Sequence, residues 1–434
     1  MDMNLVFDAI KAEMKPSMGC TEPVALALAV SRTCEHLDAP TQKLEMLISS
    51  NIFKNAYSVQ IPNAGTYGIE LACVLGMLLS KPGNTMEICA GIKPEHVEKA
   101  KKLVAEGFVH VKVLKSSQFY IECTATDGKD TVHTITEDEH DNLVFCEKNG
   151  EVLLDKRVKK EAVESEEKEG TFDVTKHTFS EFYHWANEVD VADLQFIKEA
   201  IDINMEIAKK GMEKKYAFGV GPTVQDLLKK GLLKSDVVTA VRSIPAAAAD
   251  FRMSGGNGSV MTFCGSGNQG ITVTMPIVIY GRAWQADREL ILRALVLANL
   301  ISVHQKKYIG SLSAYCGATS AATGAACGVA YMMLRQKGEQ ERIYQILCDT
   351  ITNSIETLGG MVCDGAKASC AAKIGLAVEN ALMALELSLA GNVFQPGEGM
   401  TMEDPEDTIA AVGRMGRVGM KSTDVEILNI LLGN

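Results

Sequence analysis

The sequence is poor in features that mark several common protein classes. It contains no Cys-X-X-Cys pair, which argues against zinc ribbons and thioredoxin-like redox sites. Aromatic residues make up only 6% and prolines number 11, so Ala, Val, Leu, Met and Gly must fill much of the interior. Lys and Arg number 43 against 55 Asp and Glu, a formal net charge of −12. Such an acidic chain is poorly suited to bind nucleic acids or anionic membrane surfaces.

The sequence also contains no stretch typical of a targeting signal or a membrane-spanning helix. Residues 1–15 mix charged and apolar residues and lack the basic and apolar blocks of a secretion signal. The apolar run 273–280 is too short to span a bilayer. The run 314–334 is rich in Ala, Gly, Ser and Thr, which is typical of a tightly packed buried helix. We therefore expect a cytoplasmic protein whose 12 cysteines are reduced thiols.

Hydrophobic periodicity predicts a mainly α fold. With 434 residues and a hydrophobic fraction of 47%, the chain can bury a sizeable core. Helical patterns dominate at both ends, whereas short alternating segments typical of strands lie between them, with a hairpin turn at Asp127-Gly128. The pattern predicts a helical domain of residues 1–82 and 170–434. An inserted small α+β domain with a charged linker is expected over 83–169.

Finer features of the N-terminal part are also predicted. The polar residues 51–65 are expected to form a loop, and residues 86–90 a strand. Pro23 suits the first turn of a helix that Thr21 or Glu22 would cap.

Three glycine-rich segments that carry cysteines interrupt the helices of the C-terminal part, at 254–270, 309–317 and 359–369. Irregular loops of this kind on a helical scaffold suggest a composite site. Cys363 and Cys370 flank Gly365, where the chain can fold so that both sulfurs meet. With Cys316 as a third thiol, the set is compatible with an iron–sulfur cluster. By spacing alone, however, buried structural cysteines remain the simpler interpretation.

Four strings carry a resemblance to a known family. They are Met18-Gly19-Cys20-Thr21-Glu22-Pro23, Gly265-Ser266-Gly267-Asn268-Gln269-Gly270, Ala314-Tyr315-Cys316-Gly317 and Met361-Val362-Cys363-Asp364-Gly365-Ala366-Lys367-Ala368-Ser369-Cys370. Together they resemble the L-cysteine desulfidase family (UPF0597), which is related to the alpha domain of iron–sulfur L-serine dehydratases. The similarity runs from about residue 10 to about residue 420.

The resemblance implies an oxygen-sensitive [4Fe-4S] cluster held by Cys316, Cys363 and Cys370, with one iron open to substrate. It also implies that Cys20 is the catalytic base. Cys20 precedes a predicted helix start, where the helix dipole favours a thiolate. The related serine dehydratases end in a cysteine-bearing tail, whereas this sequence ends Leu431-Leu432-Gly433-Asn434, so a tail-capped cluster is not expected here.

Candidates for binding the substrate carboxylate lie in the glycine-rich loops and near residue 54. Glycines let backbone N–H groups approach an anion. The candidates are Ser254, Ser266, Asn268, Gln269, Lys54 and Asn55. A plain glycine-rich turn and a surface lysine are the competing interpretations. Cys264 is a reserve ligand, Cys327 is expected in the core, and His304 is an alternative base or a structural histidine.

The function so implied is a carbon–sulfur lyase that acts on a small amino acid and converts L-cysteine to hydrogen sulfide, pyruvate and ammonia. L-Serine dehydration and a non-catalytic iron–sulfur or thiol sensor are the alternatives. A pyridoxal-phosphate lyase would catalyse the same net reaction, but the sequence shows no convincing lysine-centred motif for that cofactor. The sequence leaves open whether the chain forms a homo-oligomer.

Overall fold

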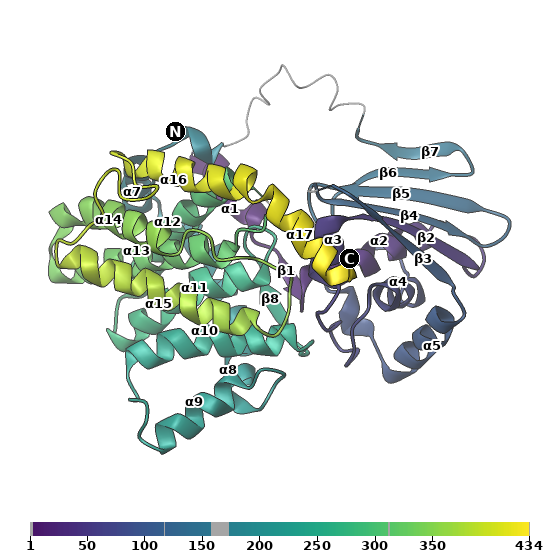
Figure 1. Ribbon diagram of the computed structural model, residues 1–434, viewed down its shortest axis with the longest axis horizontal. Coiled ribbons are helices and arrows are strands. Elements are labelled where there is room, and N and C mark those ends of the chain that lie inside the picture. Colours follow the sequence, from purple (N-terminus) through teal and green to yellow (C-terminus); the bar gives the residue numbers. More distant parts are fainter. Residues whose placement is uncertain (1–2, 117, 158–172, 311–312, 434) are drawn as a thin grey trace.

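The computed structural model describes residues 3–116, 118–157, 173–310 and 313–433. The chain is mainly helical with a smaller α+β part, as predicted. Figure 1 shows two lobes side by side, one built of helices and one built around a sheet. The predicted charged linker falls largely outside the described residues. No helix in the described ranges combines the length and apolarity needed to cross a bilayer.

The helical lobe is built around one buried helix. Its helices are α1 (Met3–Glu13), α7 (Phe179–Glu188), α8 (Ile197–Glu213), α9 (Val220–Lys229), α10 (Val237–Met253), α11 (Gly267–Ala283), α12 (Arg288–Ile309), α13 (Gly317–Lys337), α14 (Ile343–Thr357), α15 (Cys370–Leu389), α16 (Pro405–Arg414) and α17 (Lys421–Leu432). Short turns are η2 (Val174–Lys176), η3 (Val191–Phe196), η4 (Gln340–Arg342) and the π-helical η5 (Met415–Gly419).

The central helix α13 packs against α11, α12, α14 and α15. Its small residues make this possible: a Cβ at Gly324 would lie 2.1 Å from the hydroxyl oxygen of Ser302 on α12. The tightly packed buried helix predicted from the Ala- and Gly-rich run is therefore confirmed.

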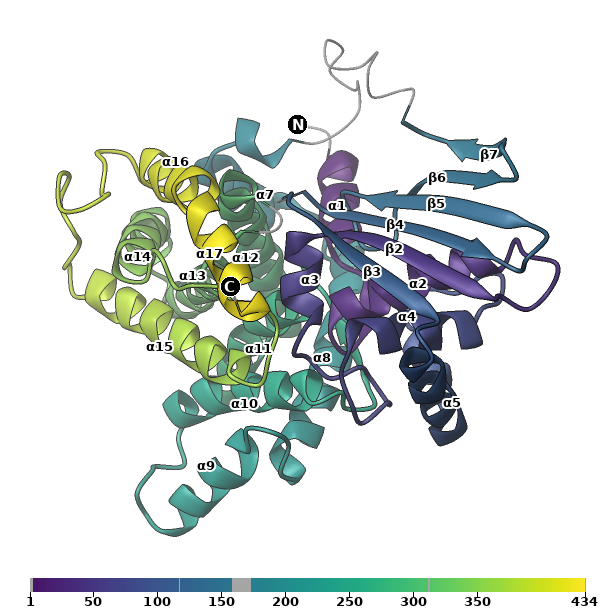
Figure 2. The same ribbon diagram turned by 45° about the vertical axis from the view of Figure 1, so that its right-hand side comes forward.

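The sheet lobe holds six strands in the order β3-β2-β4-β5-β6-β7. They are β2 (Lys43–Ser49), β3 (Val109–Leu114), β4 (Tyr120–Thr126), β5 (Thr131–Glu137), β6 (Leu143–Lys148) and β7 (Glu151–Asp155). Only β2 and β3 pair in parallel. Helices α2 (Thr21–Cys34) and α4 (Ile69–Leu78) pack against the sheet, and α5 (Pro94–Ala105) packs on α4, as Figure 2 shows. The predicted hairpin at Asp127-Gly128 joins β4 to β5.

The predicted domain boundary at residue 82 needs correction. Strand β2 lies inside the sheet, and α2 and α4 share one hydrophobic core with β2 and β4. Only α1, at the N-terminus, packs into the core of the helical lobe. Parallel pairing of β2 with β3 requires a long crossover, so local periodicity did not reveal that residues on both sides of 82 build one sheet.

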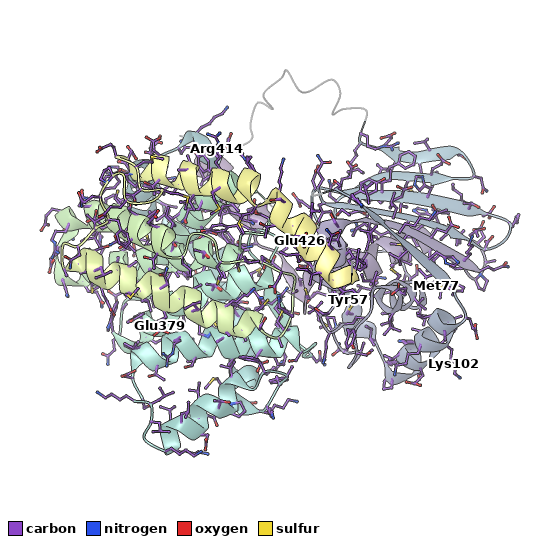
Figure 3. The ribbon with its side chains drawn as sticks, viewed as in Figure 1. Tyr57, Met77, Lys102, Glu379, Arg414 and Glu426 are labelled. Atoms are coloured by element: carbon purple, nitrogen blue, oxygen red, sulfur yellow. The ribbon has the colours of Figure 1, made fainter. Side chains whose placement is uncertain are left out.

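Two local predictions are also wrong. The expected loop at 51–65 begins with α3 (Ser50–Ala56), and the expected strand at 86–90 is replaced by the 3-10 turn η1 (Ile88–Gly91). The lobes are joined by a short antiparallel pair of β1 (Pro16–Met18) and β8 (Ser259–Met261). They are joined again where α17 meets α3, near the labelled Glu426 and Tyr57 in Figure 3.

The close approach of α2 to α4 predicts a stability effect. A Cβ at Gly76 would lie 2.2 Å from the carbonyl oxygen of Ala27, so Gly76→Ala must separate the two helices. Overpacking of this kind costs about 1–3 kcal/mol. Gly375→Ala on α15 is the control, because its Cβ would meet nothing nearer than 3.5 Å. Urea unfolding should show a lowered midpoint for Gly76→Ala alone; equal midpoints would contradict this packing.

Candidate active site

A cavity of about 540 Å³ lies where the two lobes meet. The sheet lobe lines it with residues at the start of α2, on α3 and between β5 and β6. The helical lobe lines it with residues from α10, α11, α12, α13 and the segment that leads into α15. The cavity is therefore composite, as the glycine-rich loops suggested.

The structure brings the three predicted ligand cysteines to this one cavity. Cys316 is the N-cap of α13, and Cys370 is the first residue of α15. The backbone N–H of Cys363 donates to the carbonyl of Ala314 at 2.6 Å, and that of Cys316 donates to the carbonyl of Met361 at 2.9 Å. These bonds join the two cysteine-bearing loops side by side.

The thiols of Cys316 and Cys363 interact directly. Their hydrogen bond lowers the pKa of Cys363 and, together with burial, raises the pKa of Cys316. Lys54 and Lys373 also favour a thiolate at Cys363. Burial raises the pKa of Cys370.

The chemistry of these thiols is that of iron–sulfur ligands. Within the described residues, no group of three or more His, Cys, Asp or Glu side chains is placed to hold one metal ion. The donor set is instead a group of unpaired cysteine thiols on two joined loops, with lysine ammonium groups nearby. Cysteine thiolates are the ordinary ligands of iron–sulfur clusters, so the residues present fit such a group.

Cys20 lines the same cavity and is the N-cap of α2. Its side chain is 1% exposed, and its thiol donates to Oε2 of Glu22 at 3.2 Å. Burial and the Glu22 carboxylate raise the pKa of Cys20 well above its usual value. The expected lowering by the helix dipole is therefore wrong, because burial and a carboxylate two residues away outweigh the partial charge of the helix end.

Glu22 organises this part of the cavity. Its Oε2 also accepts from the Thr21 hydroxyl at 3.0 Å, and its Oε1 accepts from the Asn55 amide at 3.0 Å. Burial alone would raise the pKa of Glu22, but the ring of His140, the Cys20 thiol and the Arg252 charge lower it to about 2. Glu22 is therefore a carboxylate at neutral pH.

The candidate carboxylate-binding residues are only partly brought together. Ser266, Asn268 and Gln269 line the cavity. Ser266 caps α11, where its hydroxyl accepts from the backbone of Gln269. Ser254 is absent from the lining, and its hydroxyl instead accepts from the backbone N–H of Ala217 at 2.9 Å.

Lys54 and Asn55 line the cavity but already have partners. Lys54 is 3% exposed, and its ammonium group pairs with Asp424 on α17 at 2.5 Å and donates to the carbonyl of Cys363 at 3.3 Å. It is a buried link between the lobes and not a surface lysine. The side-chain amide of Asn55 donates to Glu22, and this hydrogen bond alone accounts for the position of Asn55.

Of the three remaining candidates, Cys264, Cys327 and His304, only Cys264 lines the cavity. Cys264 lines the cavity at a positive φ of 48°, and burial raises its pKa. Cys327 is fully buried within α13, as expected of a core residue. His304 is buried and does not line the cavity. Its Nδ1 lies 2.9 Å from the carbonyl oxygen of Val174, and its Nε2 lies 2.5 Å from a carboxylate oxygen of Glu406. His304 is therefore a structural histidine.

The sequence analysis gave no role in the site to several cavity residues, among them Lys373, Glu22, His140 and Arg252. Glu22 lies within the string that drew attention to Cys20, and a carboxylate beside a proposed base was an available signal. His140 comes from the connection between β5 and β6, and only the arrangement of the lobes brings it to the site. Arg252 lies at the end of α10, beside the first glycine-rich loop.

Comparison with known proteins places the chain in a family. Residues 83–429 match the model of the serine dehydratase alpha chain. The chain belongs to the serine dehydratase alpha chain family. The matched segment includes Cys316, Cys363 and Cys370, whereas Cys20 precedes it.

Full-length relatives of this family member also cover the segment that holds Cys20. A UPF0597 protein of Lachnoclostridium phytofermentans is 36% identical over 98% of this chain and 99% of its own. UPF0597 proteins of Oleidesulfovibrio alaskensis and Porphyromonas gingivalis are each 35% identical over 98% of this chain and 97% of their own. The similarity thus extends over both lobes.

Proposed function

We propose that the protein is an iron–sulfur lyase that eliminates hydrogen sulfide from L-cysteine and yields pyruvate and ammonia. The observation that carries this proposal is the meeting of Cys316, Cys363, Cys370 and Cys20 at one cavity in a member of the serine dehydratase alpha chain family. β-Elimination needs a base for the α-proton and stabilisation of the leaving group, and these thiols supply candidates for both tasks.

In this proposal, Cys316, Cys363 and Cys370 hold a [4Fe-4S] cluster. When bound, a cluster with one iron free of protein ligands supplies a Lewis acid for the substrate's side-chain sulfur or oxygen. Lys54 and Lys373 offset the negative charge of the thiolates, since both already favour a thiolate at Cys363.

Cys20 is the proposed base for the α-proton. Burial and Glu22 keep its thiol protonated in the free protein. The α-ammonium group of a bound amino acid would add a positive charge beside Glu22. Because a nearby opposite charge favours the ionised form, substrate binding would shift Cys20 towards the thiolate that the reaction needs.

L-Serine dehydration is the second candidate function, and the family's description favours it. The two reactions share the α-proton step and differ in the leaving atom. A non-catalytic iron–sulfur or thiol sensor is the third candidate, and it would hold the cluster without turnover.

Substrate preference is tested by pyruvate formation from L-cysteine and from L-serine, measured separately on anaerobically purified protein. We expect kcat/KM for L-cysteine to exceed that for L-serine by about tenfold or more, a range that a binding pocket achieves for closely similar substrates. A preference for L-serine would mean that the protein is an L-serine dehydratase and not an L-cysteine desulfidase. Cluster-loaded protein that forms no pyruvate from either amino acid would support the sensor.

A further inference from the structure

Arg252 is a buried cation on the wall of the cavity. It lies one residue before the end of α10 and is 3% exposed. One guanidinium nitrogen, Nη1, donates to Oδ1 of Asn268 at 3.0 Å. The buried Nε has no hydrogen-bond partner, and Arg252 forms no ion pair with any residue that the structure describes.

The nearest carboxylate does not satisfy this cation. The charge of Arg252 lowers the pKa of Glu22, so the two groups lie close enough to interact electrostatically. The Glu22 oxygens, however, accept hydrogen bonds from Cys20, Thr21 and Asn55, and the His140 ring lies 3.7 Å from Oε1. A buried charge without a paired counter-charge is costly, so an anion that enters the cavity would offset the charge of Arg252.

The backbone around Arg252 keeps room for its guanidinium group. A Cβ at Gly267, the first residue of α11, would lie 2.4 Å from Nε of Arg252. Glycine at this position therefore lets the guanidinium lie against the helix end. That helix end adds its own partial positive charge, which further favours an anion.

We propose that Arg252 binds the α-carboxylate of the amino-acid substrate. This inference rests on the proposed function, and it assigns to Arg252 the selection of substrates that carry a carboxylate. An arginine fork matches a carboxylate with two parallel hydrogen bonds, and Asn268 holds one edge of the fork in place. The segment that carries Asn268 is itself held by backbone hydrogen bonds from Ser266 to Phe263 and from Gly270 to Ser266.

The substrate must accordingly carry a free carboxylate. Amino acids bind, whereas their amides do not make the paired contact with Arg252. L-Alanine and L-alaninamide are suitable probes, because neither has a leaving group and their binding can be measured without turnover.

Isothermal titration of both probes into anaerobically prepared, cluster-loaded protein tests the assignment. The variants are Arg252→Gln and Arg252→Lys. The matched control is Arg242→Gln on the same helix, since Arg242 is half-exposed, is absent from the cavity lining and pairs with Glu379. Figure 3 shows Glu379 on the helical lobe, away from the sheet lobe.

Wild-type protein and Arg242→Gln should bind L-alanine, and Arg252→Gln should bind it at least about 30-fold more weakly, as expected when one partner of a buried charge pair is lost. Arg252→Lys should fall between them. Arg252→Gln should also lose the preference for L-alanine over L-alaninamide. Equal binding of L-alanine by Arg252→Gln and wild-type protein would overturn the assignment.

Binding measurements on the wild-type protein test the proposal even if Arg252→Gln does not fold. Wild-type protein that binds L-alanine and L-alaninamide equally overturns the carboxylate site. If wild-type protein turns over L-cysteine and Arg252→Gln keeps its KM, the role of Arg252 alone is overturned. If wild-type protein neither binds nor turns over any amino acid, the proposed function fails, and the carboxylate site fails with it.

Discussion

Replacement of Cys363 by Ser is expected to remove bound iron and lyase activity together. Cys363 interacts with both of the other proposed ligands: its thiol hydrogen-bonds to that of Cys316, and its charge raises the pKa of Cys370. A serine hydroxyl is a harder and far less acidic group than a thiol, and it replaces cysteine poorly as an iron–sulfur ligand. The loss of activity should exceed the roughly 10–100-fold that removal of an outer-shell partner costs.

Iron content and pyruvate formation, both measured anaerobically, check this expectation. Cys327→Ser is the matched control, because Cys327 is a cysteine buried in the middle of α13 that does not line the cavity. The control should retain iron and turnover. If Cys363→Ser kept as much iron as Cys327→Ser, the assignment of the cluster to these cysteines would be wrong.

Replacement of Cys20 by Ser should separate catalysis from cluster binding. The cluster should remain, because its proposed ligands are Cys316, Cys363 and Cys370. Turnover should fall by about 10²–10⁴-fold, the usual contribution of a general base, since a serine hydroxyl near neutral pH is a far weaker base than a thiolate. The same measurements of iron and pyruvate apply.

Cys34→Ser is the control for this variant, since Cys34 is buried at the opposite end of α2. It should leave both quantities unchanged. Full activity in Cys20→Ser would assign the base to another group of the cavity, and neither His304, which lies outside the lining, nor the ion-paired Lys54 suits that role. Loss of iron as severe as in Cys363→Ser would make Cys20 a fourth ligand that substrate displaces.

The sequence predicted those features that depend on short, contiguous segments. The mainly helical fold, the buried helix α13 and the hairpin between β4 and β5 follow from local patterns of small, apolar and turn residues. The family membership followed from four strings. Gly365 led us to expect that Cys363 and Cys370 meet, with Cys316 as a third thiol. The backbone hydrogen bonds that join the loops of Cys316 and Cys363 were not foreseen from the sequence.

Features that depend on distant segments could not be predicted in this way. Strand β2 joins a sheet whose other strands follow residue 108, through a crossover that local periodicity does not show. His140 reaches the cavity only because one lobe packs on the other. The raised pKa of Cys20 reflects its complete burial, which the position of a helix start does not reveal.

The central claim is that this chain is an iron–sulfur enzyme, and the metal content of wild-type protein tests it most directly. Iron and acid-labile sulfide should be measured on anaerobically purified, enzymatically active protein. We predict about four of each per chain, with a broad brown absorbance, as a [4Fe-4S] cluster requires. Active protein that contains neither iron nor sulfide, and that shows the sharp absorbance band of pyridoxal phosphate, would contradict the account.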